Sequence, residues 1–127
     1  MKSRDTVIRL KRFQVDEKRR QVVQIEAMIA EFERMAADLD REIAVEQERA
    51  GIHDPAHFAY PTYAKAARLR RDNLARSVAD LKAQLADARA GFDEALEELK
   101  KAEALDERDH GREQAPLVPT EDERVRV

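Results

Sequence analysis

The sequence predicts an all-α protein in which two long helices fold back on each other as an antiparallel coiled-coil hairpin. Three observations support this class. Apolar residues recur every seven positions in two separate stretches, charged residues make up 40% of the chain while aromatic residues make up 5%, and the mid-chain prolines lie in one short segment. So few large apolar side chains cannot fill a layered core, whereas two amphipathic helices need only one narrow seam.

The first helix is predicted over about residues 4 to 50. Its apolar pattern starts at Ile8 and returns every seventh residue, and a companion row lies three residues further along, as the two seam positions of a coiled coil require. The pattern is strongest between residues 22 and 43. The first row reads Ile8, Val15, Val22, Ile29, Ala36, Ile43 and Ala50, and the companion row reads Lys11, Lys18, Ile25, Phe32, Leu39 and Glu46.

The segment "GIHDPAHFAYP", residues 51 to 61, is predicted to form a short helical corner. Gly51 suits the left-handed conformation that ends a helix, because glycine has no Cβ. Asp54 directly precedes a proline, which is typical of a cap followed by the first helical residue and predicts a short turn of helix over residues 55 to 59. Pro61 then opens the second long helix.

The second helix is predicted over about residues 61 to 108, where the apolar repeat resumes in a new register. Residues 1 to 109 therefore form the predicted hairpin domain. After it the repeat stops, so residues 110 to 127 are predicted to be a disordered tail, with a short linear motif as the less favoured alternative. The two seam rows of this helix read Val78, Leu85, Phe92 and Leu99, and Ala67, Leu74, Leu81, Ala88, Ala95 and Ala102.

The distribution of charge favours an antiparallel arrangement of the two helices. Folding the chain back at the corner places each charged block beside one of opposite sign, whereas a parallel homodimer would stack each block on its own copy. The same folding predicts that Ile29 lies near residue 83 and that the free chain is a monomeric hairpin. The net charges are +5 for residues 1 to 20, −6 for residues 21 to 60, +4 for residues 61 to 90 and −5 for residues 91 to 110.

Nothing in the sequence predicts catalysis or a cofactor. The chain has no cysteine, which rules out disulfides and thiolate metal ligands. His53 and His57 are four residues apart, but the proline between them interrupts the helix that such a ligand pair needs, so we expect no metal site. The glutamates lie on the expected solvent face rather than in a cleft, and no Gly-rich phosphate loop is present. We expect a protein that is not an enzyme.

Two further classes are disfavoured. The start of the chain lacks the apolar core of a signal peptide and no apolar run is long enough for a membrane span, so we expect a cytoplasmic protein without membrane insertion. A basic helix that leads into heptads is also the layout of zipper-type DNA readers. However, the seam continues through the basic block and the net charge of the chain is −3, so we expect no nucleic-acid partner.

An aromatic cluster, Phe58, Tyr60 and Tyr63, stands at and just after the corner. A two-helix hairpin has little interior in which to bury three rings. The rings either plug the open end of the seam, as a hydrophobic staple does at a helix entry, or they form a surface that binds a partner. Both interpretations remain open from the sequence, and one ring can serve each.

The run "DTVIRLKRFQVDEKRRQVVQIEAMIAEFERMAADLDREI", followed by "DPAHFAYPTYAKAA", resembles the FliJ family of flagellar type III export proteins in its alphaproteobacterial form. The similarity covers about residues 1 to 107, and the corner "HFAYPTYAKAA" carries most of its specificity because it is not heptad-like. The resemblance implies a two-helix antiparallel coiled coil similar to the central stalk of rotary ATPases. It also implies a cytoplasmic protein that associates peripherally with the inner-membrane export apparatus.

The resemblance further implies three kinds of partner. In this family the end that carries both termini inserts into the pore of the hexameric export ATPase FliI, a surface early in the second helix contacts the export gate protein FlhA, and export chaperones are escorted. A hairpin end with lysines at seam positions is loosely packed and positively charged. Both properties suit insertion into a ring of other subunits. The rival interpretation is a structural scaffold or adaptor that self-associates through its heptad seam.

Both expected contact sets follow from this assignment. The ATPase-binding residues at the basic end are Arg9, Lys11, Arg12, Lys18, Arg19 and Arg20. The gate-binding residues at the corner and the start of the second helix are Phe58, Tyr60, Tyr63, Ala67, Arg70 and Leu74.

Overall fold

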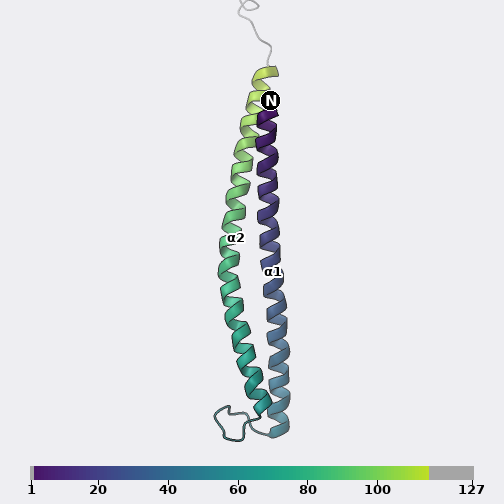
Figure 1. Ribbon diagram of the computed structural model, residues 1–127, viewed down its shortest axis with the longest axis vertical. Helices are drawn as coiled ribbons and strands as arrows, with labels where there is room; N and C mark the ends of the chain where they lie inside the picture. Colours follow the sequence, from purple (N-terminus) through teal and green to yellow (C-terminus); the bar gives the residue numbers. More distant parts are fainter. Residues whose placement is uncertain (1, 115–127) are drawn as a thin grey trace, which may run out of the picture. The chain divides into compact units, whose positions relative to one another are not determined.

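The computed structural model describes residues 2 to 114, which form two long α-helices, α1 (Lys2–Ala50) and α2 (Thr62–Gln114), joined by the corner at residues 51 to 61 (Figure 1). No residue in this described part is in a strand. The predicted all-α helical hairpin is confirmed. Charged residues also suit the ends of α1, with Asp5 in its first turn and Arg49 in its last, where they oppose the helix dipole.

Contacts within the chain divide it into two compact units. The first, here called the terminal unit, consists of α1 up to Arg19 and α2 from Gly91 onward. The second, here called the corner unit, runs from Arg20 to Ala90 and contains the corner. In each unit one segment of α1 packs against one segment of α2, so each has a core of its own.

The core of the corner unit consists of large aliphatic side chains at the predicted seam positions. Ile29 shares a buried cluster with Leu81 and Leu85, on either side of the predicted neighbour at position 83, so the predicted register is confirmed. Burial of these side chains is worth on the order of 1.5 to 3 kcal/mol each. The cluster consists of Ile29, Val78, Leu81 and Leu85 with Val22, Ile25 and Phe32 against it, and a second one consists of Leu39, Ile43 and Ala67 with Leu74.

The core of the terminal unit is smaller and more mixed. Ile8, Val15 and Leu99 are buried, as their heptad positions predict. On α1 the seam positions that follow Ile8 and Val15 are Lys11 and Lys18, and both are half-buried. Their aliphatic stems cover the seam while their ammonium groups reach water. The partly buried side chains that complete this core are Phe92, Ala95, Leu96 and Ala102.

Ion pairs join the two helices in both units, as the charge blocks predict. In the terminal unit Lys11 pairs with Glu98 at 3.4 Å and Arg12 with Glu103 at 3.0 Å. In the corner unit the pairs are Glu26 with Arg89 at 3.0 Å, Glu33 with Lys82 at 3.7 Å and Asp40 with Arg71 at 3.0 Å. Exposed pairs of this kind contribute about 0 to 1 kcal/mol each, so they select the register more than they stabilise it.

The corner begins as predicted but contains turns in place of the predicted short helix. Gly51 has a φ of 70°, in the left-handed region, and its N–H donates to the carbonyl oxygen of Gln47 at 2.8 Å. The next hydrogen bonds join the His57 N–H to the Asp54 carbonyl and the Tyr60 N–H to the His57 carbonyl, both at 3.0 Å. Each spans three residues, so the segment makes two successive turns, and no bond of α-helical spacing forms between them.

The second helix continues past its predicted end at residue 108 and includes Gly111. The reason lies in the seam, which continues with polar residues that a search for apolar repeats does not detect. Asp106 and Asp109 are half-buried at seam spacing, and Asp109 forms an ion pair with Arg4 of α1. The predicted disordered tail is therefore corrected for residues 110 to 114, which are helical, and its remainder lies outside the described residues.

Neither of the helices in the described part is long and apolar enough to cross a membrane.

Candidate protein-interaction sites

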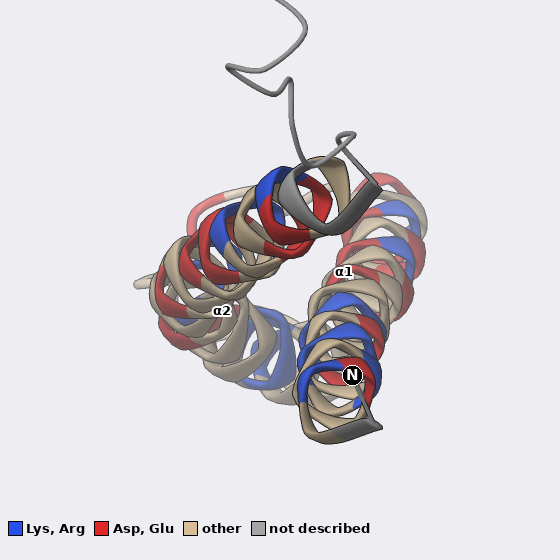
Figure 2. Ribbon diagram, turned by 90° about the horizontal axis from the view of Figure 1, so that it is seen from above, with Lys and Arg blue, Asp and Glu red and all other residues tan. Residues whose placement is uncertain are grey.

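The basic start of α1 belongs to the terminal unit, where Lys and Arg cluster near the label N in Figure 2. Of the six residues predicted there, Arg9 is exposed and forms no ion pair with another described residue. Lys11 and Arg12 are engaged with Glu98 and Glu103 of α2. A partner that binds this surface therefore finds one guanidinium available at once and must compete with carboxylates for the other two cations.

Three further residues of the predicted basic set have different surroundings. Arg19 donates to Asp16 at 2.9 Å and lies over the ring of Phe92, 5.4 Å from its centroid. The Lys18 side chain passes over Gly91, within 3.8 Å of the position that a Cβ would occupy there. Arg20 is exposed and is the first residue of the corner unit. The predicted set thus divides between the two units.

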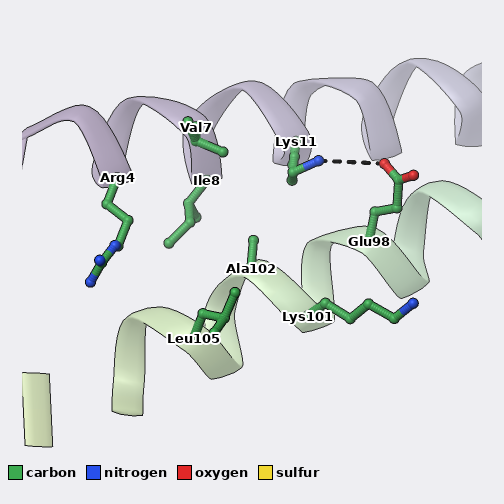
Figure 3. A pocket seen from close by; sticks show the side chains of 8 residues that line it. All are labelled: Arg4, Val7, Ile8, Lys11, Glu98, Lys101, Ala102 and Leu105. Atoms are coloured by element: carbon green, nitrogen blue, oxygen red, sulfur yellow. Dashed lines mark hydrogen bonds and ion pairs between the residues drawn. The ribbon is translucent and has the colours of Figure 1, made fainter. Parts of the chain in front are cut away.

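A groove in the terminal unit adds residues that sequence reasoning missed. Ile8 of α1 and Ala102 and Leu105 of α2 point toward one another along its floor (Figure 3). Val7 and Leu105 also line this groove and are 46% and 53% exposed. Neither falls on a heptad seam row, so periodicity alone did not select them. The remaining lining residues are Arg4, Lys11, Glu98 and Lys101.

The groove combines an apolar floor with a mostly basic edge. Three of its four charged residues are cations, and the fourth, Glu98, is paired with Lys11. An amphipathic segment of another protein, with apolar side chains for the floor and carboxylates for the edge, has the complementary chemistry. The groove and exposed Arg9 together are the strongest candidate contact surface in the terminal unit.

The corner aromatics do not all serve the same purpose. Tyr60 is 7% exposed, and its hydroxyl oxygen accepts a hydrogen bond from the Gln47 side-chain amide at 2.7 Å. The neighbouring Ala64 is fully buried. Tyr60 therefore plugs the end of the seam, and its ring is not offered to a partner.

Phe58 takes the opposite role, because it is 97% exposed. Its ring stacks on that of His57, with centroids 4.7 Å apart and an interplanar angle of 22°. The loop below is held by local hydrogen bonds: the Ala59 N–H donates to His57 Nδ1 at 3.0 Å, and the Ala56 N–H donates to Asp54 Oδ1 at 2.9 Å. These bonds restrict the loop and so present Phe58 at a low entropic cost of binding.

The other predicted gate-binding residues separate into inward and outward positions. Ala67 is buried and Leu74 is half-buried in the core of the corner unit, so neither presents its side chain to a partner. Arg70 is exposed. Tyr63 is 54% exposed, and its hydroxyl donates to a carboxylate oxygen of Glu42 at 3.0 Å. This hydrogen bond, and the negative charge of the same carboxylate, raise the pKa of Tyr63.

The two corner histidines have local roles. His57 Nδ1 accepts the Ala59 N–H, and His53 Nε2 lies 3.9 Å from a carboxylate oxygen of Glu48. Between residues 2 and 114, no three His, Cys, Asp or Glu side chains are grouped so that they could hold a metal ion. The expectation that the protein binds no metal stays a prediction.

Fold and surfaces together define a class: a helical hairpin that presents a basic groove in one unit and an exposed aromatic corner in the other. Comparison with known proteins adds no family name, because no family model, curated protein or solved structure matches this chain. The resemblance to the FliJ family therefore stays a prediction.

Proposed function

We propose that this protein is a FliJ-like, non-enzymatic component of the flagellar type III export apparatus. Its terminal unit binds the centre of the hexameric export ATPase, its corner binds the export gate, and it acts from the cytoplasm in peripheral association with the export apparatus. The observation that carries the proposal is the pair of half-buried lysines, Lys11 and Lys18, at seam positions of the terminal unit. Escort of export chaperones belongs to the same proposal.

Seam lysines support an ATPase contact for an energetic reason. A lysine at a seam position lowers the stability of a two-helix core relative to an apolar residue, because its ammonium group reaches out to water and less apolar surface is buried in the seam. A binding partner that supplies carboxylates or carbonyl groups around the hairpin offsets that cost. Charged hydrogen bonds across such an interface are worth about 1.5 to 3 kcal/mol each.

The gate contact rests on fewer residues than the sequence predicts. Phe58, Tyr63 and Arg70 are exposed, and they are the members of the predicted set that a partner can touch. Exposed aromatic rings and arginines are the side chains that most often dominate binding free energy at protein interfaces. We therefore assign the gate contact to these three.

The ATPase contact is tested with a matched pair of triple variants and the purified FliI-type ATPase. Arg9→Glu, Arg12→Glu and Arg19→Glu together reverse three exposed charges in the terminal unit. Arg34→Glu, Arg41→Glu and Arg49→Glu do the same in the corner unit, where each arginine is exposed and paired three residues back along α1. We expect the first triple to abolish stimulation of ATP hydrolysis and the second to keep it, with helicity by circular dichroism retained in both. Equal stimulation by both would reject the contact.

The gate contact needs a separate measurement. Phe58→Ala with Tyr63→Ala should weaken binding to the cytoplasmic part of an FlhA-type protein by tenfold or more while ATPase stimulation stays unchanged. The control is Val23→Ala, which removes an exposed aliphatic side chain elsewhere in the corner unit. If the control weakens gate binding as much as the aromatic variant, the assignment to the corner is wrong.

A scaffold that self-associates is the second candidate, and Leu10 and Phe13 favour it. They are 55% and 58% exposed and lie three residues apart on the outer face of α1, so they are neighbours on one apolar patch. Sedimentation equilibrium separates the candidates. A monomer supports the stalk, whereas a dimer that Leu10→Gln with Phe13→Gln dissociates supports the scaffold.

A further inference from the structure

The two sides of the corner unit carry different chemistry. All three of its described ion pairs between helices use α1 residues seven positions apart, Glu26, Glu33 and Asp40. Each directly follows a seam residue, so the three lie along one side of the seam. This side is closed by charged side chains that are already paired across the helices.

The opposite side lacks charge along its centre. In the middle of α1 the residues that directly precede the other seam row are Gln21, Met28 and Met35, and the next one toward the corner is Glu42. Met28 and Met35 are 46% and 39% exposed. In an antiparallel pair, the residues that precede the seam row of one helix face their equivalents on the other, which here are Ser77 and Gln84 of α2. We call these five residues, without Glu42, the methionine strip.

Acidic residues border the methionine strip on both helices. Each lies three residues beyond a strip residue and is therefore its neighbour on the helix surface. Glu31 and Asp38 on α1 are exposed and paired with Arg34 and Arg41 of the same helix.

The border on α2 consists of Asp80 and Asp87. Both are exposed, and neither forms an ion pair with any residue in the described part of the chain. This edge is therefore the more available acidic one.

We propose that the methionine strip binds a basic amphipathic helix of a partner protein. The apolar face of that helix lies on Met28 and Met35, and its lysines or arginines meet Asp80 and Asp87. Methionine side chains are unbranched and polarisable, so they adapt to apolar residues of different shapes, and the apolar face of an amphipathic helix is a common ligand for such anchors. The proposal involves neither the basic groove nor Phe58, so it stands apart from the proposed function.

Charge decides between this partner and a second copy of the chain. Two copies that meet through their methionine strips would bring the acidic borders of both together, because a two-fold interface uses the same patch on each subunit. Like charges face to face oppose association, whereas a basic helix is attracted by the unpaired Asp80 and Asp87. The occupant is therefore a basic helix.

The test uses the full-length chain and a synthetic peptide as the probe. The peptide has about 18 residues, or five helical turns, with leucines on one face and lysines beside them. Two comparison peptides are a scrambled version without an apolar face and a version with glutamate in place of lysine. We expect the first to bind and become helical, and both comparison peptides to bind at least tenfold more weakly, by fluorescence anisotropy and circular dichroism.

Variants of the chain locate the binding surface. Met28→Gln with Met35→Gln should weaken peptide binding tenfold or more, and helicity should be preserved because glutamine and methionine have similar helix propensities. Asp80→Asn with Asp87→Asn should weaken it about threefold to tenfold and flatten its salt dependence. The matched control is Val23→Gln with Val45→Gln, which changes aliphatic residues that are 56% and 54% exposed outside the strip, and it should bind like the wild type.

Three outcomes would overturn the proposal. Equal weakening by the valine control would show that the peptide binds apolar surface without a defined site. Equal binding of the glutamate peptide would show that the acidic border plays no part. A dimer in sedimentation that the methionine variant dissociates would assign the strip to a second copy of the chain.

Discussion

The cores of the corner unit and the terminal unit follow the same heptad pattern but differ in what occupies it. In the corner unit both rows of α1 are apolar around Ile29, and a cluster of aliphatic residues surrounds it. In the terminal unit Ile8 and Val15 alternate with half-buried Lys11 and Lys18. On α1 the seam of the corner unit is thus apolar without interruption from Val22 to Ile43, whereas lysines interrupt that of the terminal unit.

This difference between the seams predicts which unit stabilises the hairpin and which unit is available to bind a partner. A continuous apolar seam stabilises the pairing of helices in proportion to the area it removes from water. An interrupted seam opens at a lower free energy, and segments of low local stability are the ones that partners most often engage. The corner unit is therefore expected to hold the hairpin together, and the terminal unit to respond to a partner.

The largest expected effect comes from the same substitution made in both units. Ile29 and Ile8 are 8% and 7% exposed, so they form a matched pair. Ile29→Ala should lower the free energy of unfolding by about 3 kcal/mol, because the rigid cluster leaves a cavity. Ile8→Ala should lower it by about 1 kcal/mol, because the looser seam closes around the missing atoms. Urea denaturation followed by circular dichroism measures both.

Amide hydrogen exchange can locate the destabilised region in each of the same two variants. Ile29→Ala should speed exchange of amides throughout the corner unit, while Ile8→Ala should affect amides of the terminal unit alone. Equal losses of stability for the two variants would show that the two seams are equivalent, contrary to the comparison.

The next effect converts the terminal seam into one like that of the corner unit. Lys11→Leu with Lys18→Leu should raise the free energy of unfolding by about 1 to 2 kcal/mol, because buried methyl groups replace cations and only one exposed pair, Lys11 with Glu98, is lost. Under the proposed function the same variant should stimulate the export ATPase less. If the variant is more stable and still stimulates the export ATPase fully, the seam lysines play no part in that stimulation.

Two glycines should respond to alanine with opposite signs. Gly51→Ala should cost about 1 to 2 kcal/mol, since φ is 70° there and a Cβ disfavours the left-handed conformation. Gly91→Ala should gain about 0.5 to 1 kcal/mol, because Gly91 lies inside α2 and its nearest added contact is the Lys18 side chain at 3.8 Å. Thermal melting in parallel checks both. A stabilised Gly51→Ala variant would contradict the described end of α1.

The smallest effect concerns pH at the corner unit. The hydrogen bond to Glu42 raises the pKa of Tyr63 above its ordinary value of 10.0, so Tyr63 holds its proton more tightly in the folded chain. Its contribution to stability is present below that ordinary value and is lost as the pH rises through the raised pKa. Tyrosinate absorbance in a Tyr60→Phe background reports Tyr63 alone. Adding Glu42→Gln should lower the apparent pKa, and an unchanged titration would show that the hydrogen bond is absent in solution.

Heptad spacing alone predicted most of the buried residues. Ile29, Leu39 and Leu81 are buried because a side chain that returns every seventh residue stays on one face of a helix, and that face is apolar here. The predicted start of the corner at Gly51 is likewise a local property of glycine and is confirmed by its φ. These features depend on one helix or one residue at a time.

The candidate sites were predicted less well, because they depend on both helices together. Tyr60 and Phe58 are two residues apart and equally aromatic, yet one is 7% and the other 97% exposed. The difference depends on which ring faces Gln47, which only the packed corner decides. The end of α2 was also missed, because its last seam positions are aspartates and not apolar residues, and one of them, Asp109, pairs with Arg4 of α1.

By itself, the sequence determined two amphipathic helices, the glycine that ends the first and the opposite charges that favour their antiparallel pairing, since each follows from the periodicity or chemistry of a continuous segment. Only the tertiary structure decided which cations are neutralised, which aromatic ring is buried and which carboxylates are paired between the helices. Those properties depend on the register between two helices. A shift of that register by one residue would leave each helix amphipathic and would change every pair across the seam.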